Sequence, residues 1–218
     1  MDETIILKDT EFFILLAAVG MAGVPGFQQG MKPEEENVPY LIHEMVRKQV
    51  LVQKGGELAP VELLQEIVHG VKQATKILVF EDEQGKGQAY IYVGESFVLS
   101  EDSLHENNAV RLQLLTDETC LEYLDNYFFQ EDILVYPEEL IPKTLEEEDG
   151  KLRKRVTLYD LATGRLGREE IQWELYEGKY NKYIEIVTKE NVIRKEYKGW
   201  KPDDVLQTMK KSAGGSKG

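Results

Sequence analysis

The feature that most constrains the fold is a unit that occurs twice after residue 60. Each unit has a helix-like stretch, four short apolar segments separated by glycine-containing turns, and a closing helix. This order predicts an α+β protein with antiparallel β-meanders packed with helices and an internal pseudo-two-fold duplication. The residue identities barely match between the units, so a plain α+β meander without duplication is the alternative.

The first unit opens with an amphipathic helix. Leu64, Val68 and Val71 recur at three- and four-residue steps, which predicts a helix over residues 60–75. Asp117 is expected to cap the closing helix. The strands of this unit are expected at residues 76–80, 88–93, 97–99 and 110–115.

The second unit opens at Pro137 and passes through an acidic stretch to Gly150. Ile171, Trp173 and Leu175 alternate with polar residues, which predicts a sheet with one buried face. The strands are expected at residues 155–159, 170–177, 180–187 and 192–197, with a last helix from residue 202. The resulting division is an N-terminal helical segment with a short β-ribbon (1–59), two helix–meander–helix units (60–136 and 137–212) and a flexible tail (213–218).

The first sixty residues predict two helices, a β-ribbon and a third helix. Asp9 is expected to cap the first helix, which stops at Gly20, and a second helix is expected near residues 38–48. The order is like that of a winged helix. The helix after the ribbon, however, carries Glu62 and Glu66 with only one basic residue, Lys72, so nucleic-acid binding is not expected.

These sixty residues also resemble the start of a known family. The first helix is rich in leucine, ends at a glycine and is followed by Val24-Pro25; later a glycine turn leads through Leu58-Ala59-Pro60 into a helix. This pattern is similar to that of the EspG family, the cytosolic chaperones of bacterial type VII secretion. The resemblance implies a pseudo-symmetric α/β body without catalysis that recognises the tip of a helical-hairpin secretion substrate. No binding residue of the family maps onto this sequence.

Composition is that of an ordinary globular protein, with 42% hydrophobic and 30% charged residues. The longest apolar run, residues 12–24, is too short to span a bilayer, and the acidic Asp2 and Glu3 precede it. Cys120 is the only cysteine, so no disulfide framework is expected. We therefore expect a cytoplasmic location and no membrane insertion.

Charge is divided unevenly along the chain. Residues 1–150 hold 10 basic and 30 acidic residues, a net charge of −20, whereas residues 151–218 hold 16 basic and 10 acidic residues, a net charge of +6. The two parts can attract one another within one fold. Alternatively, an acidic face attracts a basic partner or repels nucleic acid.

Few residues suggest chemistry. His43, His69 and His105 are isolated from other metal-ligating residues, and the sequence has no phosphate-binding loop. Cys120 falls near the start of a predicted helix, where a thiol can be acidified, or it is a small core residue. We expect no enzyme activity, metal or cofactor; a small enzyme with a scattered active site is the alternative.

An exposed apolar patch ringed by polar groups would suit recognition of a helix tip. The candidates are Tyr127, Phe128, Phe129 and Trp200, because three consecutive aromatic residues spread around a helix. Packing in the core is the alternative for each. The sequence thus favours a chaperone or adaptor for a helical partner protein, and a regulatory or structural interaction module unrelated to secretion is a further possibility.

Overall fold

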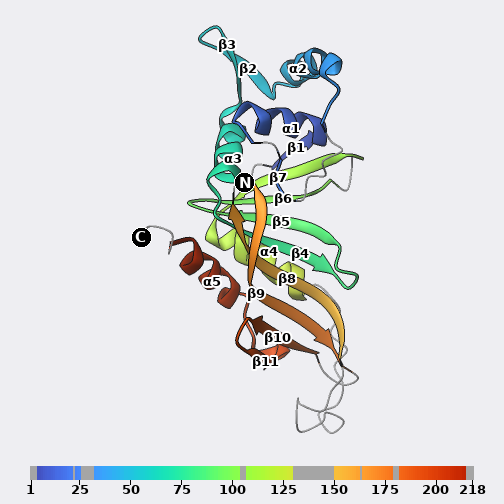
Figure 1. Cartoon of the computed structure of the whole chain (residues 1–218), viewed down its shortest axis with the longest axis vertical. Coiled ribbons are helices and arrows are strands. Elements are labelled where there is room, and N and C mark those ends of the chain that lie inside the picture. Colours follow the sequence, from blue (N-terminus) through green and yellow to red (C-terminus); the bar gives the residue numbers. More distant parts are fainter. Residues whose placement is uncertain are drawn as a thin grey trace.

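Alternating apolar residues along the strands build a nine-stranded, fully antiparallel sheet in the order β1-β7-β6-β5-β4-β8-β9-β10-β11 (Figure 1). The computed structural model describes residues 4–21, 23–25, 32–103, 107–129, 150–162, 164–178 and 182–214. The strands are β1 (Thr4–Lys8), β4 (Lys76–Asp82), β5 (Gly87–Val93), β6 (Phe97–Asp102), β7 (Ala109–Leu115), β8 (Lys151–Ala162), β9 (Arg165–Glu177), β10 (Lys182–Thr188) and β11 (Val192–Glu196). A separate two-stranded ribbon consists of β2 (Leu51–Lys54) and β3 (Glu57–Pro60).

The helices are α1 (Asp9–Ala18), α2 (Val38–Arg47), α3 (Glu62–Gln73), α4 (Asp117–Phe129) and α5 (Asp203–Gly214), with the short 3-10 helices η2 (Glu35–Asn37) and η5 (Tyr197–Gly199). The predicted α+β class with antiparallel meanders is therefore confirmed.

Two meanders run outward from the centre of the sheet. β4 to β7 form one, β8 to β11 form the other, and β4 pairs with β8 antiparallel between them. A helix follows each meander, α4 after β7 and α5 after β11. This order is what a pseudo-two-fold duplication requires, but strand order alone does not demonstrate it, so the duplication stays a prediction. The expected start of the second unit at Pro137 lies outside the described residues.

The sheet buries a separate apolar cluster on each face. On one face, strand residues such as Phe80 and Trp173 pack with Phe128 of α4 and Met209 of α5. On the other face, α1 and α3 contribute to a second cluster, which includes the fully buried Phe12. The alternating pattern within one strand explains the division, because Ile77 belongs to the second cluster and Leu78 to the first.

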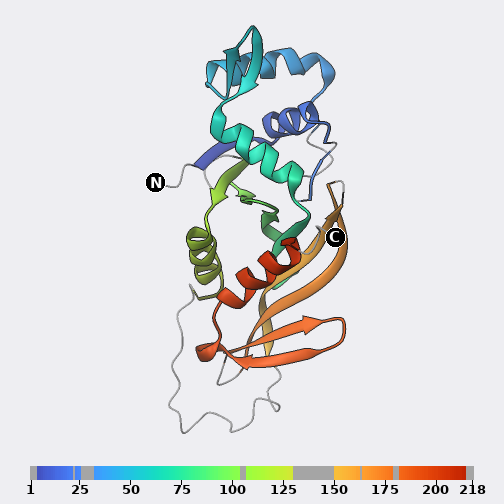
Figure 2. The same ribbon diagram turned by 90° about the vertical axis from the view of Figure 1, so that its left-hand side faces the viewer.

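The N-terminal elements stand at one end of an elongated molecule, and β10 and β11 stand at the other (Figures 1 and 2). α2 and the β2–β3 ribbon join the body through the buried Met45 and Leu51. The buried carboxylate of Glu11 in α1 accepts hydrogen bonds from the Lys8 N–H at 2.9 Å and from Lys48 Nζ at 2.7 Å. This contact fixes the end of α2 against α1.

Ion pairs account for part of the uneven charge. Basic residues of the C-terminal part reach acidic residues of the N-terminal part: Lys151 contacts Glu83 at 2.6 Å, Arg155 lies 3.9 Å from Glu81, and Lys210 pairs with Asp117. The two parts do attract one another within the fold, although such exposed pairs contribute little to stability because water screens them.

The structure corrects three local predictions. β1 was not expected, because its five residues lie against a helix start that dominated the sequence pattern. The first helix is capped at Lys8 rather than at Asp9, which is helical. α4 begins at Asp117, and its cap is the Thr116 hydroxyl, which accepts a hydrogen bond from the Thr119 N–H at 3.2 Å.

Cys120 of α4 lies in the core, and its burial changes the pKa of its thiol. Its side chain is fully buried, and burial, helped by the charge of Asp117, raises the pKa of the thiol to about 12. The acidified thiol considered from the sequence is therefore wrong. Because the folded-state pKa is raised, the protonated thiol stabilises the fold below its unfolded pKa of about 8.5, and that contribution is lost as the pH rises from there toward 12.

We expect iodoacetamide at pH 8 to leave Cys120 unmodified in the folded protein and to modify it fully in denaturant, as read by intact-mass spectrometry. Modification of the folded protein at the rate of the unfolded chain would contradict the buried, protonated thiol.

Candidate functional site

The four aromatic residues singled out from the sequence gather where α4 meets η5 and α5. Phe128 is fully buried and Trp200 is 4% exposed, with their ring centroids 4.9 Å apart. Phe129 is partly buried and lies 4.8 Å from the Tyr197 ring. Tyr127 donates a hydrogen bond from its hydroxyl to the Glu81 carbonyl at 2.6 Å.

The expected exposed patch at Phe128 and Trp200 is therefore corrected to core packing. An isolated helix can bury only one stripe, but α4 has the sheet on one side and η5 with α5 on the next, so Phe128 and Trp200 are buried and Tyr127 and Phe129 are partly buried. Sequence periodicity considers one helix at a time and does not include the second covering element.

Exposed apolar side chains concentrate instead on α2 and the β2–β3 ribbon, which we name the α2–ribbon module (residues 38–60). Of the eight large apolar residues that are exposed among those described, four belong to this module: Tyr40, Val46, Val52 and Leu58. Tyr40 is 65% exposed and Leu58 51% exposed. Single exposed apolar residues are normal, whereas a concentration within 19 residues suggests an interaction surface.

The ribbon exposes both of its faces. In its register Val52 lies opposite Ala59, and Gln53 lies opposite Leu58, so Val52 and Leu58 point to opposite faces. Gly55 and Gly56 form the turn with φ values of +64° and +90°, which suits a tight two-residue hairpin. A two-stranded ribbon is marginally stable by itself, and only its root is packed here, through Leu51.

Charged side chains of both signs accompany these apolar residues. Arg47 pairs with Glu44 on α2 at 2.6 Å, and Lys54 lies opposite Glu57 at the end of the ribbon. The module therefore combines apolar side chains with a polar surround, as protein-binding surfaces do.

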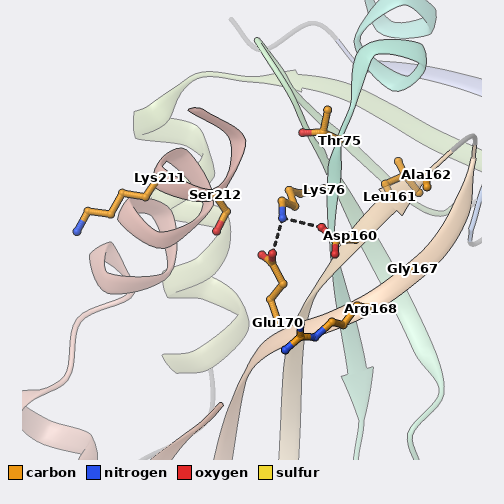
Figure 3. A pocket seen from close by; sticks show the side chains of 10 residues that line it. All are labelled: Thr75, Lys76, Asp160, Leu161, Ala162, Gly167, Arg168, Glu170, Lys211 and Ser212. Atoms are coloured by element: carbon orange, nitrogen blue, oxygen red, sulfur yellow. Dashed lines mark hydrogen bonds and ion pairs between the residues drawn. The ribbon is translucent and has the colours of Figure 1, made fainter. Parts of the chain in front are cut away.

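A second feature is an open pocket of about 660 Å³ between the sheet and the end of α5 (Figure 3). Lys76 of β4 lies at its centre, bonded to Asp160 of β8 at 2.6 Å and to Glu170 of β9. Gly167 lets the backbone of β9 lie close to Asp160, because a Cβ at Gly167 would lie 2.9 Å from the Cβ of Asp160. The pocket is lined by Thr75, Lys76, Asp160, Leu161, Ala162, Gly167, Arg168, Glu170, Lys211 and Ser212.

The chemistry of this pocket is that of a fixed cation. Burial by itself lowers the pKa of Lys76, but the hydrogen bonds and charges of Asp160 and Glu170 outweigh it, so the pKa lies above its ordinary value. A nucleophilic lysine needs a lowered pKa, and Lys76 is instead held protonated at neutral pH. The triad of side chains joins three strands.

Neither metal ligation nor a membrane span is found in the part of the chain that the structure describes. No group of three or more His, Cys, Asp or Glu side chains there could hold a metal ion. None of the described helices is long and apolar enough to cross a membrane. His105 lies outside the described residues.

In comparisons with known proteins, no protein-family model matches this sequence, and no match was found among curated proteins. The likeness to the EspG family therefore stays an interpretation of the order of elements and of short sequence patches.

The buried aromatic cluster predicts a loss of stability on truncation. We expect Phe128→Ala to lower the free energy of unfolding by about 3–5 kcal/mol, because it removes a fully buried ring. Tyr40→Ala, the exposed control, should change it by no more than about 0.5 kcal/mol. Urea titration of both variants checks this, and equal effects would contradict the contrast between core and surface.

The Lys76 triad predicts a pH-independent stabilisation near neutrality. Lys76→Met should lower the free energy of unfolding by about 1.5–3 kcal/mol, the worth of hydrogen bonds to charged groups. Because the folded-state pKa of Lys76 is raised, its contribution is complete below the unfolded pKa of about 10.4 and is lost only above it. Urea titrations at pH 7, 9 and 11 should show a constant difference up to pH 9 and a smaller one at pH 11.

Proposed function

We propose that this protein is a non-enzymatic chaperone or adaptor that binds a helical segment of another protein through the α2–ribbon module. The observation that carries the proposal is the concentration of exposed apolar side chains on α2 and on both faces of the ribbon. Burying them against an apolar helix face would gain about 25 cal/mol per Å².

The geometry suits a helix better than an extended strand as the partner. α2 and the projecting ribbon run in different directions (Figure 2), and both carry exposed apolar side chains. An amphipathic helix presents apolar residues along one face and can contact side chains of both elements together. A tyrosine as exposed as Tyr40 is also of the residue type that most often dominates binding energy.

The EspG-like resemblance supplies a specific partner class for this proposal. It implies a helical-hairpin substrate of a type VII-like secretion system, kept soluble by the chaperone in the cytoplasm. An interaction module unrelated to secretion would use the same surface, so the two versions differ in the identity of the partner and not in the residues that bind.

The test is co-expression of the chain with small helical-hairpin proteins encoded beside its gene, followed by affinity measurement on the purified complex. We expect the double variant Tyr40→Ala, Leu58→Ala to bind at least about tenfold more weakly, with an unchanged melting temperature. Leu166→Ala, which truncates an apolar residue 48% exposed on β9, is the matched control and should bind as the wild type does.

Two outcomes would remove this proposal in whole or in part. One is a complex whose affinity is the same in the double variant and the wild type. The other is that none of the neighbouring helical proteins binds the wild-type chain, which would remove the secretion-substrate version of the proposal.

A further inference from the structure

The two ends of the nine-stranded sheet differ. At one end β1 covers β7, the outer strand of the first meander, from Thr4 opposite Gln113 to Lys8 opposite Ala109. At the other end β11 is the outer strand of the second meander, and no described strand takes the position on β11 that β1 takes on β7. Among the residues that the structure describes, the second meander thus ends at β11, whereas the first is extended by a fifth strand, β1.

The backbone of β11 offers hydrogen bonds at this edge. The Thr188 N–H donates to the Asn191 carbonyl at 2.8 Å, which closes the β10–β11 hairpin with a hydrogen-bonded pair. Hydrogen-bonded and non-hydrogen-bonded pairs alternate along an antiparallel ladder. Every second residue from Val192 to Glu196 therefore points its N–H and C=O away from β10.

Two of the five side chains of β11 are apolar and exposed, and they precede the charged Arg194, Lys195 and Glu196. Val192 is 59% exposed and Ile193 is 49% exposed, on opposite faces of the sheet. Ile193 ends an apolar row that crosses five strands through directly opposed residues, namely Phe80, Val156, Trp173, Ile186 and Ile193. The residues of the row are buried at the centre of the sheet, and the last one, Ile193, is exposed at the sheet edge.

The basic side chains of β11, which could prevent another strand from pairing with it, make contacts within their own chain. Exposed edges are commonly protected by lysine or by other charges. Here the guanidinium of Arg194 lies 4.2 Å from the centre of the Tyr183 ring and donates to Glu185 at 2.9 Å. Lys195 is bonded to Asp204 of α5 at 2.8 Å. Both side chains are held against their own subunit.

We propose that β11 pairs antiparallel with β11 of a second copy of this chain, with Ile193 opposite Ile193 of the second copy. The two copies would be related by a two-fold axis, so that the same strand of each copy forms the interface. Two-fold symmetry is the commonest arrangement of homodimers. The apolar row then continues from one sheet into the other, and the outward-facing backbone groups of Val192 and Arg194 meet as hydrogen-bonded pairs. Because Glu185 neutralises each Arg194, the symmetric contact brings no unpaired arginines together.

This dimer has a functional consequence. The α2–ribbon module stands at the opposite end of the molecule from β11 (Figure 1). Pairing at β11 leaves both modules free, one at each far end of the dimer, so one dimer presents two partner-binding surfaces. A five-residue strand makes a small interface, and we therefore expect association at about micromolar concentration or above.

The test is sedimentation velocity over a concentration series from low micromolar to submillimolar. The wild type should pass from monomer to dimer, and Ile193→Lys should associate at least about tenfold more weakly. Ile6→Lys is the matched control, since Ile6 is 42% exposed on the other edge strand, and it should dimerise as the wild type does. Should Ile193→Lys fold poorly, Val192→Lys tests the same edge from the other face.

Hydrogen exchange locates the contact. The amides of Val192 and Arg194 should gain protection in the concentrated sample, whereas the amide of Ile193, which faces β10, should be protected at every concentration. A wild type that stays monomeric throughout, or a dimer unaffected by Ile193→Lys and Val192→Lys, would overturn the proposal. Protection of the outward amides only in a complex with another protein would assign the edge to that protein and also overturn it.

Discussion

The antiparallel pairing of β4 with β8 is the interaction on which the rest of the structure depends. It joins segments about eighty residues apart in seven opposed pairs, from Lys76 with Asp160 to Asp82 with Lys154. Leu78 and Phe80 thereby lie beside Leu158 and Val156, which makes one apolar floor from two meanders. α4 and α5 pack together on that floor, against strand residues of both meanders. Such a non-local pairing costs loop-closure entropy before it gains burial, which slows folding relative to a fold built of local contacts.

The two meanders extend in opposite directions from the central β4–β8 pair, and the two ends of the sheet differ. The first meander continues into β1, α1 and the α2–ribbon module, which the contact of Glu11 with Lys48 fixes in place. The second meander ends at β11 without a further described strand. The features proposed for binding lie at these ends, the α2–ribbon module for a helical partner and β11 for a second copy.

The helical period correctly predicts that the aromatic residues at the end of α4 point in different directions, but the exposed patch inferred from it is wrong. Three consecutive rings do spread around the helix, and the sequence shows that much. Tyr127 packs on the sheet against Phe80, whereas Phe128 contacts Trp200 and Phe129 contacts Tyr197 of η5, residues about seventy positions later in the chain that cover another side of α4. The apolar residues of α2 and the ribbon are the opposite case, because the sequence pattern did not single them out and the structure leaves them exposed. Val52 and Leu58 occur in an ordinary alternating hairpin pattern, and only the absence of a covering layer over both ribbon faces, among the residues described, distinguishes them from core strands.

By itself the sequence determined most local elements, although not β1: the helices of apolar period three to four, the alternating strands, the glycine turns and therefore the α+β class with two meanders. These follow from short-range geometry, in which backbone conformation and side-chain direction are set within a few residues. The tertiary structure alone decided which strands are central and which are edges, which aromatic rings are buried, and that Lys76 meets Asp160 and Glu170 across three strands. Those properties depend on contacts between residues far apart in the chain, and a single sequence holds no periodic signal for them.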